Sequence, residues 1–220
     1  MKNKLTLVFL VLAFVTLGCK FLGGSSTGSG SSSGGGGTAT GGSDPKADII
    51  AASKKFIDLK SFSAKMEGMG QTEIKSQVDY LAPDRFHIQY LGGTGAGMEM
   101  IVVGSDMYMK AAGTGKWSKM PGNGGAAIPN LRDSFTEEGL KTLSDVKFDG
   151  EETIDGKPVM VYSYKNVTPK GGFPFTSKTY VNKDTGLPMR IKVDYENGTL
   201  KTMTVNYDTE TPVTIEAPSV

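Results

Sequence analysis

Residues 187–208 read LPMRIKVDYENGTLKTMTVNYD, and the pattern of this stretch decides the fold. Apolar side chains occupy every second position on both sides of a turn at Asn197-Gly198. Such alternation is typical of half-buried antiparallel strands joined by a hairpin. A turn with Gly198 in the left-handed conformation predicts that Ile191 pairs with Met203, because the apolar faces of the two strands then coincide.

The same period of two recurs along the chain between residues 85 and 164. The segment Lys183-Asp184-Thr185-Gly186 predicts a further tight turn that ends on a left-handed glycine. We therefore expect a meander of eight or more antiparallel strands, and a sheet of that width curls. The apolar residues expected on its concave face are Phe86, Ile88, Tyr90, Met98, Met100, Val102, Met107, Met109, Trp117, Met160, Tyr162, Tyr164, Met189, Ile191, Val193, Met203, Val205 and Tyr207.

Two regions have helical patterns instead. Asp44-Pro45 has the form of a helix N-cap followed by proline at the first helical position, and it predicts a helix over about 45–58. Residues 128–146, IPNLRDSFTEEGLKTLSDV, predict one or two short inserted helices. The predicted fold class is α+β, mainly antiparallel β. It is an unclosed β-barrel, a curled sheet whose concave face is covered by an N-terminal helix and the inserted helices.

The first 18 residues have the pattern of a secretory signal. Lys2 and Lys4 precede an apolar stretch of about a dozen residues, which is shorter than the roughly 20 that a membrane-spanning helix needs. The stretch Thr16-Leu17-Gly18-Cys19 resembles a bacterial lipobox, although leucine is usual at the position of Thr16. This resemblance implies that Cys19 carries acyl chains such as palmitate and anchors the protein to a membrane. An ordinary signal peptide with an incidental cysteine is the alternative.

A linker of low complexity follows the cysteine. Residues 23–43 contain only Gly, Ser, Thr and one Ala, a composition that cannot form a core. Such a linker spans about 25 Å on average. We therefore divide the chain into a lipoprotein signal at 1–18, a lipidated cysteine with a disordered tether at 19–45, and a folded domain at 46–220.

Composition excludes several functions. The formal net charge is +1, with 24 basic against 23 acidic residues, so nothing predicts electrostatic binding of nucleic acid. Because His87 and Cys19 are the only residues of their kinds, a His/Cys metal site and a Cys–His catalytic pair are excluded. We expect no metal, no other cofactor and no enzymatic activity, and we expect His87 to face solvent.

The predicted concave face is rich in methionine and tyrosine. Methionine is unbranched and adapts to varied apolar partners. Two interpretations follow from the pattern alone: these side chains pack a core against the helices, or they line a cavity for an acyl chain.

Several segments together resemble a known family. Ala82-Pro83-Asp84-Arg85-Phe86 and Thr185-Gly186-Leu187-Pro188, in this order, are similar to the lipoprotein-localisation carrier superfamily, which includes LolA/LolB-like and LppX/LprG-like proteins. The similarity covers roughly residues 46–210. It implies an unclosed antiparallel barrel with a helical lid that holds acyl chains of lipids or acylated proteins and transfers them across the cell envelope.

The secretory signal and the lipobox resemblance also imply a location. The protein would be secreted across the inner membrane and lipid-anchored in the bacterial envelope, as a monomer. In a host with two membranes it would lie on the periplasmic side of the outer membrane. The alternative is a structural or signalling envelope lipoprotein whose half-barrel is filled by its own side chains and binds protein partners.

Overall fold

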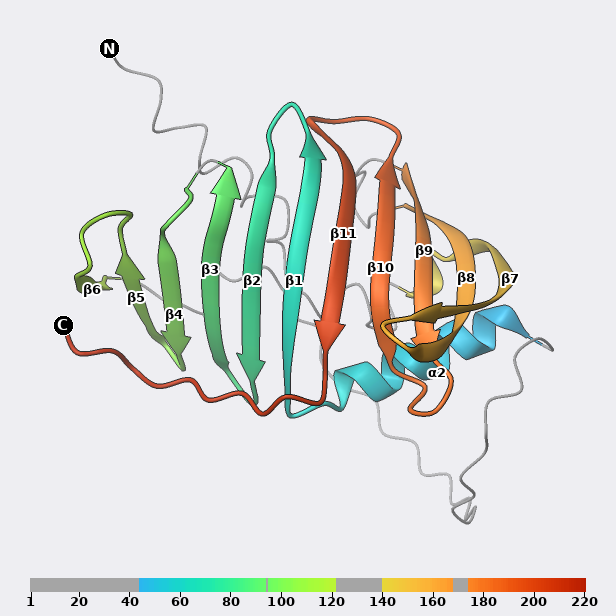
Figure 1. The fold of residues 1–220 in the computed structure, drawn as a ribbon, viewed down its shortest axis with the longest axis horizontal. Helices are drawn as coiled ribbons and strands as arrows, with labels where there is room; N and C mark the ends of the chain where they lie inside the picture. The colour runs from blue at the N-terminus through green and yellow to red at the C-terminus, as the bar shows by residue number, and fades with distance from the viewer. Residues whose placement is uncertain (1–43, 94, 122–139, 168–173) are drawn as a thin grey trace, which may run out of the picture.

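The computed structural model describes residues 44–93, 95–121, 140–167 and 174–220. In this part of the chain, eleven antiparallel strands form one sheet in the order β6-β5-β4-β3-β2-β1-β11-β10-β9-β8-β7 (Figure 1). The two edge strands, β6 and β7, do not pair with each other, so the sheet is not closed. The predicted fold class, a mainly β half-barrel with a helix on one face, is confirmed.

The strands form two meanders, β1–β6 and β7–β11. The chain passes from the edge strand β6 to the opposite edge at β7, and the two meanders meet where β11 pairs with β1. Their bounds are β1 (Ser61–Gly70), β2 (Ile74–Leu81), β3 (Arg85–Gly93), β4 (Glu99–Val103), β5 (Asp106–Lys110), β6 (Trp117–Met120), β7 (Ser144–Ile154), β8 (Lys157–Val167), β9 (Pro174–Asn182), β10 (Pro188–Tyr195) and β11 (Leu200–Asp208).

Helix α2 (Pro45–Ile57) begins as the sequence predicts. The Asp44 carboxylate accepts hydrogen bonds from the backbone N–H groups of Lys46 at 3.1 Å and Ala47 at 3.0 Å. This cap satisfies two amides that the first helical turn leaves without intrahelical partners. Proline at Pro45 costs nothing there, because the N–H group it lacks would have no helical partner.

The register of the ladders divides the side chains between two faces. Phe62 lies opposite Tyr80, and Tyr80 lies opposite Phe86, so these three aromatic residues share one face. Phe56 of α2 packs against this face, which we call the inner face. The other face is called the outer face.

The C-terminal segment lies on the outer face. It leaves β11 and runs past the lower ends of β1–β4 in Figure 1. Ile215 is buried against Ile101 and Tyr108, and the Arg85 guanidinium donates to the Ile215 carbonyl at 2.9 Å. The segment thus covers apolar side chains on the lower-numbered half of the sheet.

The hairpin quoted at the start differs in register from the prediction. Ile191 pairs with Val205, and Val193 pairs with Met203. The connection between the strands is residues 196–199, four residues, and each partner on β11 lies two residues further along than predicted. Because a shift of two keeps every side chain on its original side, the apolar faces still coincide. The predicted turn at Gly186 is confirmed: its φ is 70°, and its N–H donates to the Asn182 carbonyl at 2.8 Å.

The predicted inserted helices fall largely on residues 122–139, which lie outside the described residues. Leu140 and Lys141 are helical, and β7 begins at Ser144. The last part of the predicted helical region, Ser144–Val146, is therefore strand, and that part of the prediction is wrong. No helix among the described residues is long and apolar enough to cross a membrane.

Candidate functional site

The inner face carries three apolar clusters, which lie side by side across the sheet. The central cluster joins α2 to the middle strands and consists of Phe56, Phe62, Ala64, Tyr80, Ile191, Val193 and Val205. The helix-side cluster lies between α2 and β7–β9 and consists of Ile49, Ala52, Leu140, Leu143, Met160, Tyr162 and Val181. The methionine cluster lies on β2–β4 and consists of Val78, Ile88, Met100 and Val102, with Met66, Phe86, Tyr90, Met107 and Met109 packed around it.

Most of the residues predicted for the concave face lie in these clusters or pack against them. They are Phe86, Ile88, Tyr90, Met100, Val102, Met107, Met109, Met160, Tyr162, Tyr164, Ile191, Val193, Met203, Val205 and Tyr207. Met98 lies in the connection before β4, where its carbonyl accepts from the Tyr90 N–H at 3.0 Å. The alternation of the sequence therefore identifies most of the residues in the three apolar clusters of the inner face.

Trp117 and Met189 lie on the outer face instead. Trp117 pairs with Lys110 and packs against the cluster of Ile101, Tyr108 and Ile215. The prediction that Trp117 and Met189 lie on the concave face is therefore wrong.

For Met189 the physical reason is a β-bulge. The pairing of β10 with β9 shifts between Pro188 and Arg190, and the extra residue turns Met189 to the outer face. There Met189 packs against a cluster of Ile154, Val159, Val161 and Tyr180.

Sequence reasoning missed the contribution of β1 and β2. Phe62, Val78 and Tyr80 are each buried on the inner face, with at most 4% of their surface exposed. The segments SFSAKM and KSQVDY do alternate, but small and polar residues fill many of their positions. The alternation of apolar and polar residues was thus present in β1 and β2, but it was weaker than in the methionine-rich strands.

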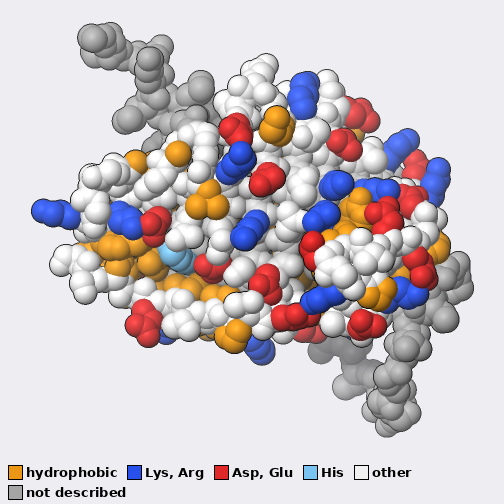
Figure 2. Space-filling view, in the orientation of Figure 1, with side chains coloured by type: hydrophobic (Ala, Val, Ile, Leu, Met, Phe, Trp, Pro, Cys, Tyr) orange, Lys and Arg blue, Asp and Glu red, His pale blue; other side chains and the backbone are white. Residues whose placement is uncertain are grey.

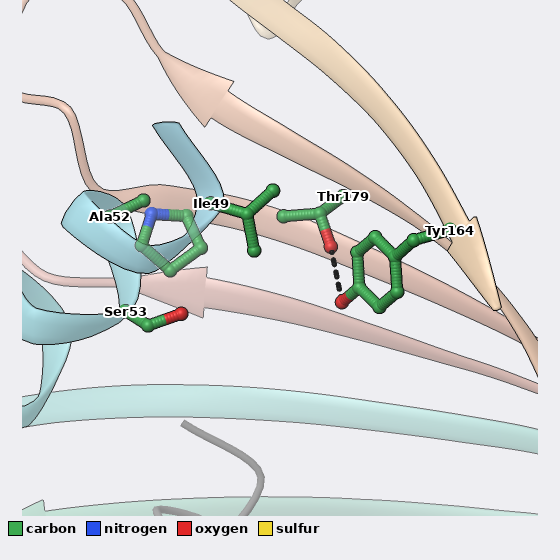
Figure 3. A pocket seen from close by; sticks show the side chains of 6 residues that line it. Ile49, Ala52, Ser53, Tyr164 and Thr179 are labelled. Carbon is green, nitrogen blue, oxygen red and sulfur yellow. Dashed lines mark hydrogen bonds between the residues drawn. The ribbon is translucent and has the colours of Figure 1, made fainter. Parts of the chain in front are cut away.

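Polar groups on the inner face are paired beneath the helix. The Tyr162 hydroxyl donates to the Asp48 carboxylate at 2.9 Å, which ties β8 to the first turns of α2. Tyr164 and Thr179 share a hydrogen bond of 3.0 Å, and Figure 3 shows both side chains facing Ile49, Ala52 and Ser53 of the helix. The first bond holds α2 against the sheet, and the second joins β8 to β9 beneath the helix.

The space left under α2 is small. A crevice of about 10 Å³ is lined by Ile49, Ala52, Ser53, Tyr164, Thr179 and Pro188 (Figure 3). A site needs roughly 10–15 Å³ to hold one water molecule, so this crevice admits one water at most. The described side chains around this crevice therefore leave no room for an acyl chain there.

The inner face is an environment of low polarity. Burial raises the pKa of the Tyr90, Tyr164 and Tyr207 phenols above the ordinary value of 10.0. Burial, together with the hydrogen bond to Asp48, likewise raises the pKa of Tyr162. An uncharged surface of this kind suits apolar contacts and disfavours a charged ligand group.

An alkaline titration tests this burial. In the unfolded chain these phenols ionise near pH 10, whereas the folded protein keeps them neutral to higher pH. The unfolded state therefore loses protons first, and the free energy of unfolding falls as the pH rises above 10. We expect part of the near-ultraviolet tyrosinate signal of the eight tyrosines to appear only together with the loss of circular dichroism. Complete ionisation of all eight in the folded protein would contradict the burial described here.

The outer face has a mixed, charged surface. Figure 2 shows acidic and basic side chains interspersed on this face, with the chain's only histidine among them. His87 Nε2 lies 3.1 Å from a Glu99 carboxylate oxygen, and Glu99 also pairs with Lys110. The hydrogen bond from Lys110 lowers the pKa of Glu99. His87 is thus a partly exposed member of a surface ion network, with 22% of its side chain exposed.

Nothing in the described ranges forms a metal site, because no three His, Cys, Asp or Glu residues there are grouped in a way that could hold an ion. The expected lack of a cofactor remains a prediction.

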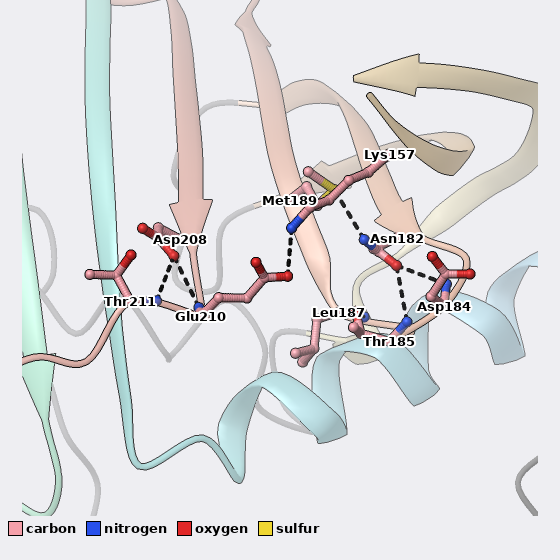
Figure 4. A network of polar contacts seen from close by, with 9 residues as sticks. All are labelled: Lys157, Asn182, Asp184, Thr185, Leu187, Met189, Asp208, Glu210 and Thr211. Atoms are coloured by element: carbon pink, nitrogen blue, oxygen red, sulfur yellow. Dashed lines mark hydrogen bonds and ion pairs between the residues drawn. The ribbon is translucent and has the colours of Figure 1, made fainter. Parts of the chain in front are cut away.

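A larger cleft of about 280 Å³ lies where β10 and β11 meet the β7–β8 turn (Figure 4). Its lining residues come from the β7–β8 turn, from the β9–β10 turn with the strand ends beside it, and from the end of β11 with the segment after it. They are Asp155, Lys157, Asn182, Thr185, Leu187, Met189, Tyr207, Asp208, Thr209, Glu210 and Thr211.

Two solved structures share this fold over nearly their whole length. Lipoprotein LppX of Mycobacterium tuberculosis matches with a TM-score of 0.57 and 16% sequence identity, over 78% of this chain and 98% of that one. LprF of Mycobacterium bovis matches with a TM-score of 0.59 and 15% identity, over 80% of this chain and 97% of that one. Likeness at this level of identity establishes the fold, and the fold implied by the sequence resemblance is therefore confirmed.

A LolA superfamily protein of Nitrosomonas europaea is more remote, with a TM-score of 0.32 and 11% identity over 74% of this chain and 91% of its own. That likeness supports no further argument. No protein-family model matches the sequence. The sequence comparison with curated proteins gives no match.

Proposed function

We propose that this protein is a membrane-anchored lipoprotein that binds acyl chains of lipids or acylated proteins on the inner face of its half-barrel and transfers them across the cell envelope. The methionine cluster is the observation that carries the proposal. Among the described residues, none from helix α2 belongs to this cluster. Flexible methionines at its edge, Met66 of β1 and Met107 and Met109 of β5, pack around it. Methionine side chains can adapt to acyl chains of different length and shape.

The N-terminal region supports anchoring. A lipidated Cys19 would tie the domain to a bilayer through the tether of residues 20–45, and two or more acyl chains are needed for stable attachment. LppX, which shares the fold, is itself described as a lipoprotein. We place this protein in the bacterial envelope as a monomer, and the proposal includes no catalytic step and no nucleic-acid partner.

One observation favours a second function. The crevice beneath α2 admits one water at most, so the side chains that line it leave no room for an acyl chain. A half-barrel filled throughout would act as a structural or signalling lipoprotein that binds protein partners on its surface.

A binding titration separates the two functions. We expect the full-length protein to bind pyrene-labelled hexadecanoic acid saturably, and its melting temperature to rise with the probe concentration. A ligand at 100 times its Kd adds about 2.7 kcal/mol to the free energy of unfolding. An unchanged melting temperature and a non-saturable signal would contradict acyl binding and favour the second function.

A further inference from the structure

The pairing of β10 with β11 ends before the two strands do. The ladder stops at Arg190 and Asn206, whereas β11 continues to pair with β1 as far as Asp208, and β10 continues to pair with β9 back to Pro188. The bulge after Pro188 and the missing N–H group of proline both prevent the ladder from continuing. The sheet therefore opens at this point, between two strands in its interior.

The cleft of about 280 Å³ lies at this opening (Figure 4). Two of its walls, Leu187 and Tyr207, pack against the central cluster of the inner face. A third wall, Met189, packs against the cluster around Tyr180 on the outer face. One cleft thus reaches apolar side chains of both faces.

The rim of the cleft is charged. Lys157 and Glu210 form an ion pair of 2.5 Å across it, and their side chains are 39% and 64% exposed. The Asp208 carboxylate accepts from the backbone N–H groups of Glu210 and Thr211, each at 3.0 Å. An exposed ion pair contributes only about 0–1 kcal/mol, so the Lys157–Glu210 pair opens at little cost.

We propose that this cleft, the β10–β11 portal, is the passage through which an acyl chain moves between the outside and the inner face, while the polar headgroup stays at the charged rim. The inference rests on the acyl binding proposed above. The arrangement matches an amphiphile, because apolar walls lie below a charged rim. A volume of about 280 Å³ is at the lower end of the roughly 300–1,000 Å³ of ligand pockets, which suits a passage better than a site for a whole lipid.

The test compares the rates at which the fatty-acid probe binds and leaves with its equilibrium Kd. Thr209 lines the cleft and belongs to none of the three inner-face clusters, and Thr209→Trp places a much larger side chain in the cleft. A blocked passage raises the barrier in both directions, so we expect the association and dissociation rates of pyrene-labelled hexadecanoic acid to fall together by about tenfold, with an unchanged Kd. Thr72→Trp, in the exposed β1–β2 turn at the opposite end of the sheet, is the matched control and should exchange at the wild-type rate.

A second variant changes the rates in the other direction. Lys157→Ala removes the ion pair across the rim and should speed exchange by a few-fold. Lys183→Ala removes a comparable pair with Glu151, 2.6 Å long, which does not line the cleft, and should leave the rates unchanged.

The outcomes are distinguishable. Wild-type exchange rates in both Thr209→Trp and Lys157→Ala would overturn the portal while leaving acyl binding intact. A raised Kd with an unchanged association rate in Thr209→Trp would also overturn it, since the cleft would then be a binding subsite. A wild-type protein that takes up no probe would overturn the proposed function and the portal with it.

Discussion

Replacing Phe56 by alanine is expected to lower the free energy of unfolding by about 3–5 kcal/mol, the usual cost of deleting a fully buried phenylalanine ring. Phe56 is 0% exposed, and its ring centroid lies 4.8 Å from that of Phe62 and 4.9 Å from that of Tyr207. The ring fixes the C-terminal half of α2 to β1 and β11. Loss of the ring leaves a cavity. Helix α2 cannot move to close this cavity, because the Tyr162–Asp48 hydrogen bond holds its N-terminal end in place.

The measurement is urea unfolding followed by circular dichroism. Lys54→Ala, on the exposed side of the same helix, is the control and should change the free energy of unfolding by less than about 0.5 kcal/mol. Equal effects of the two substitutions would show that α2 is not part of the core.

Replacing Met100 by glutamine is expected to weaken binding of pyrene-labelled hexadecanoic acid by at least about tenfold, which corresponds to about 1.4 kcal/mol. Met100 is 6% exposed and belongs to the methionine cluster on the inner face. Glutamine has a similar shape but places an amide where the acyl chain would lie, and burying an amide without a partner costs free energy.

The adjacent residue provides the matched control. Ile101 is 8% exposed and points to the outer face, where it packs against Tyr108 and Ile215. Ile101→Gln should destabilise the protein to a similar degree, by about 1–3 kcal/mol, and leave the Kd unchanged. If both substitutions weaken binding equally, the loss comes from stability and the inner face is not the binding surface.

The sequence predicted which face of the sheet each side chain occupies better than it predicted register shifts and bulges. A period of two assigns each residue to a face, and this assignment survived even where the register of the Ile191 hairpin was two residues away from the prediction. It failed at Met189, because a bulge inserts one residue and reverses the face. No local pattern distinguishes that bulge from a regular strand start.

The portal was also beyond sequence reasoning. Lys157, Met189 and Glu210 lie far apart along the chain, at the start of β8, near the start of β10 and after β11, and only the order of strands brings them to one cleft. The pairing of β11 with β1 joins distant segments of the chain, and alternation does not specify such a pairing. The methionine-rich surface was predictable, whereas the point at which the sheet opens was not.

The most direct test of acyl binding is native mass spectrometry of the full-length protein purified from its own membrane. We predict two kinds of added mass: acyl groups attached covalently at Cys19, and a lipid that dissociates on collisional activation and leaves the acylated chain behind. A protein that carries no dissociable lipid, and takes up none when offered phospholipid vesicles, would contradict the central claim that the inner face of the half-barrel holds acyl chains.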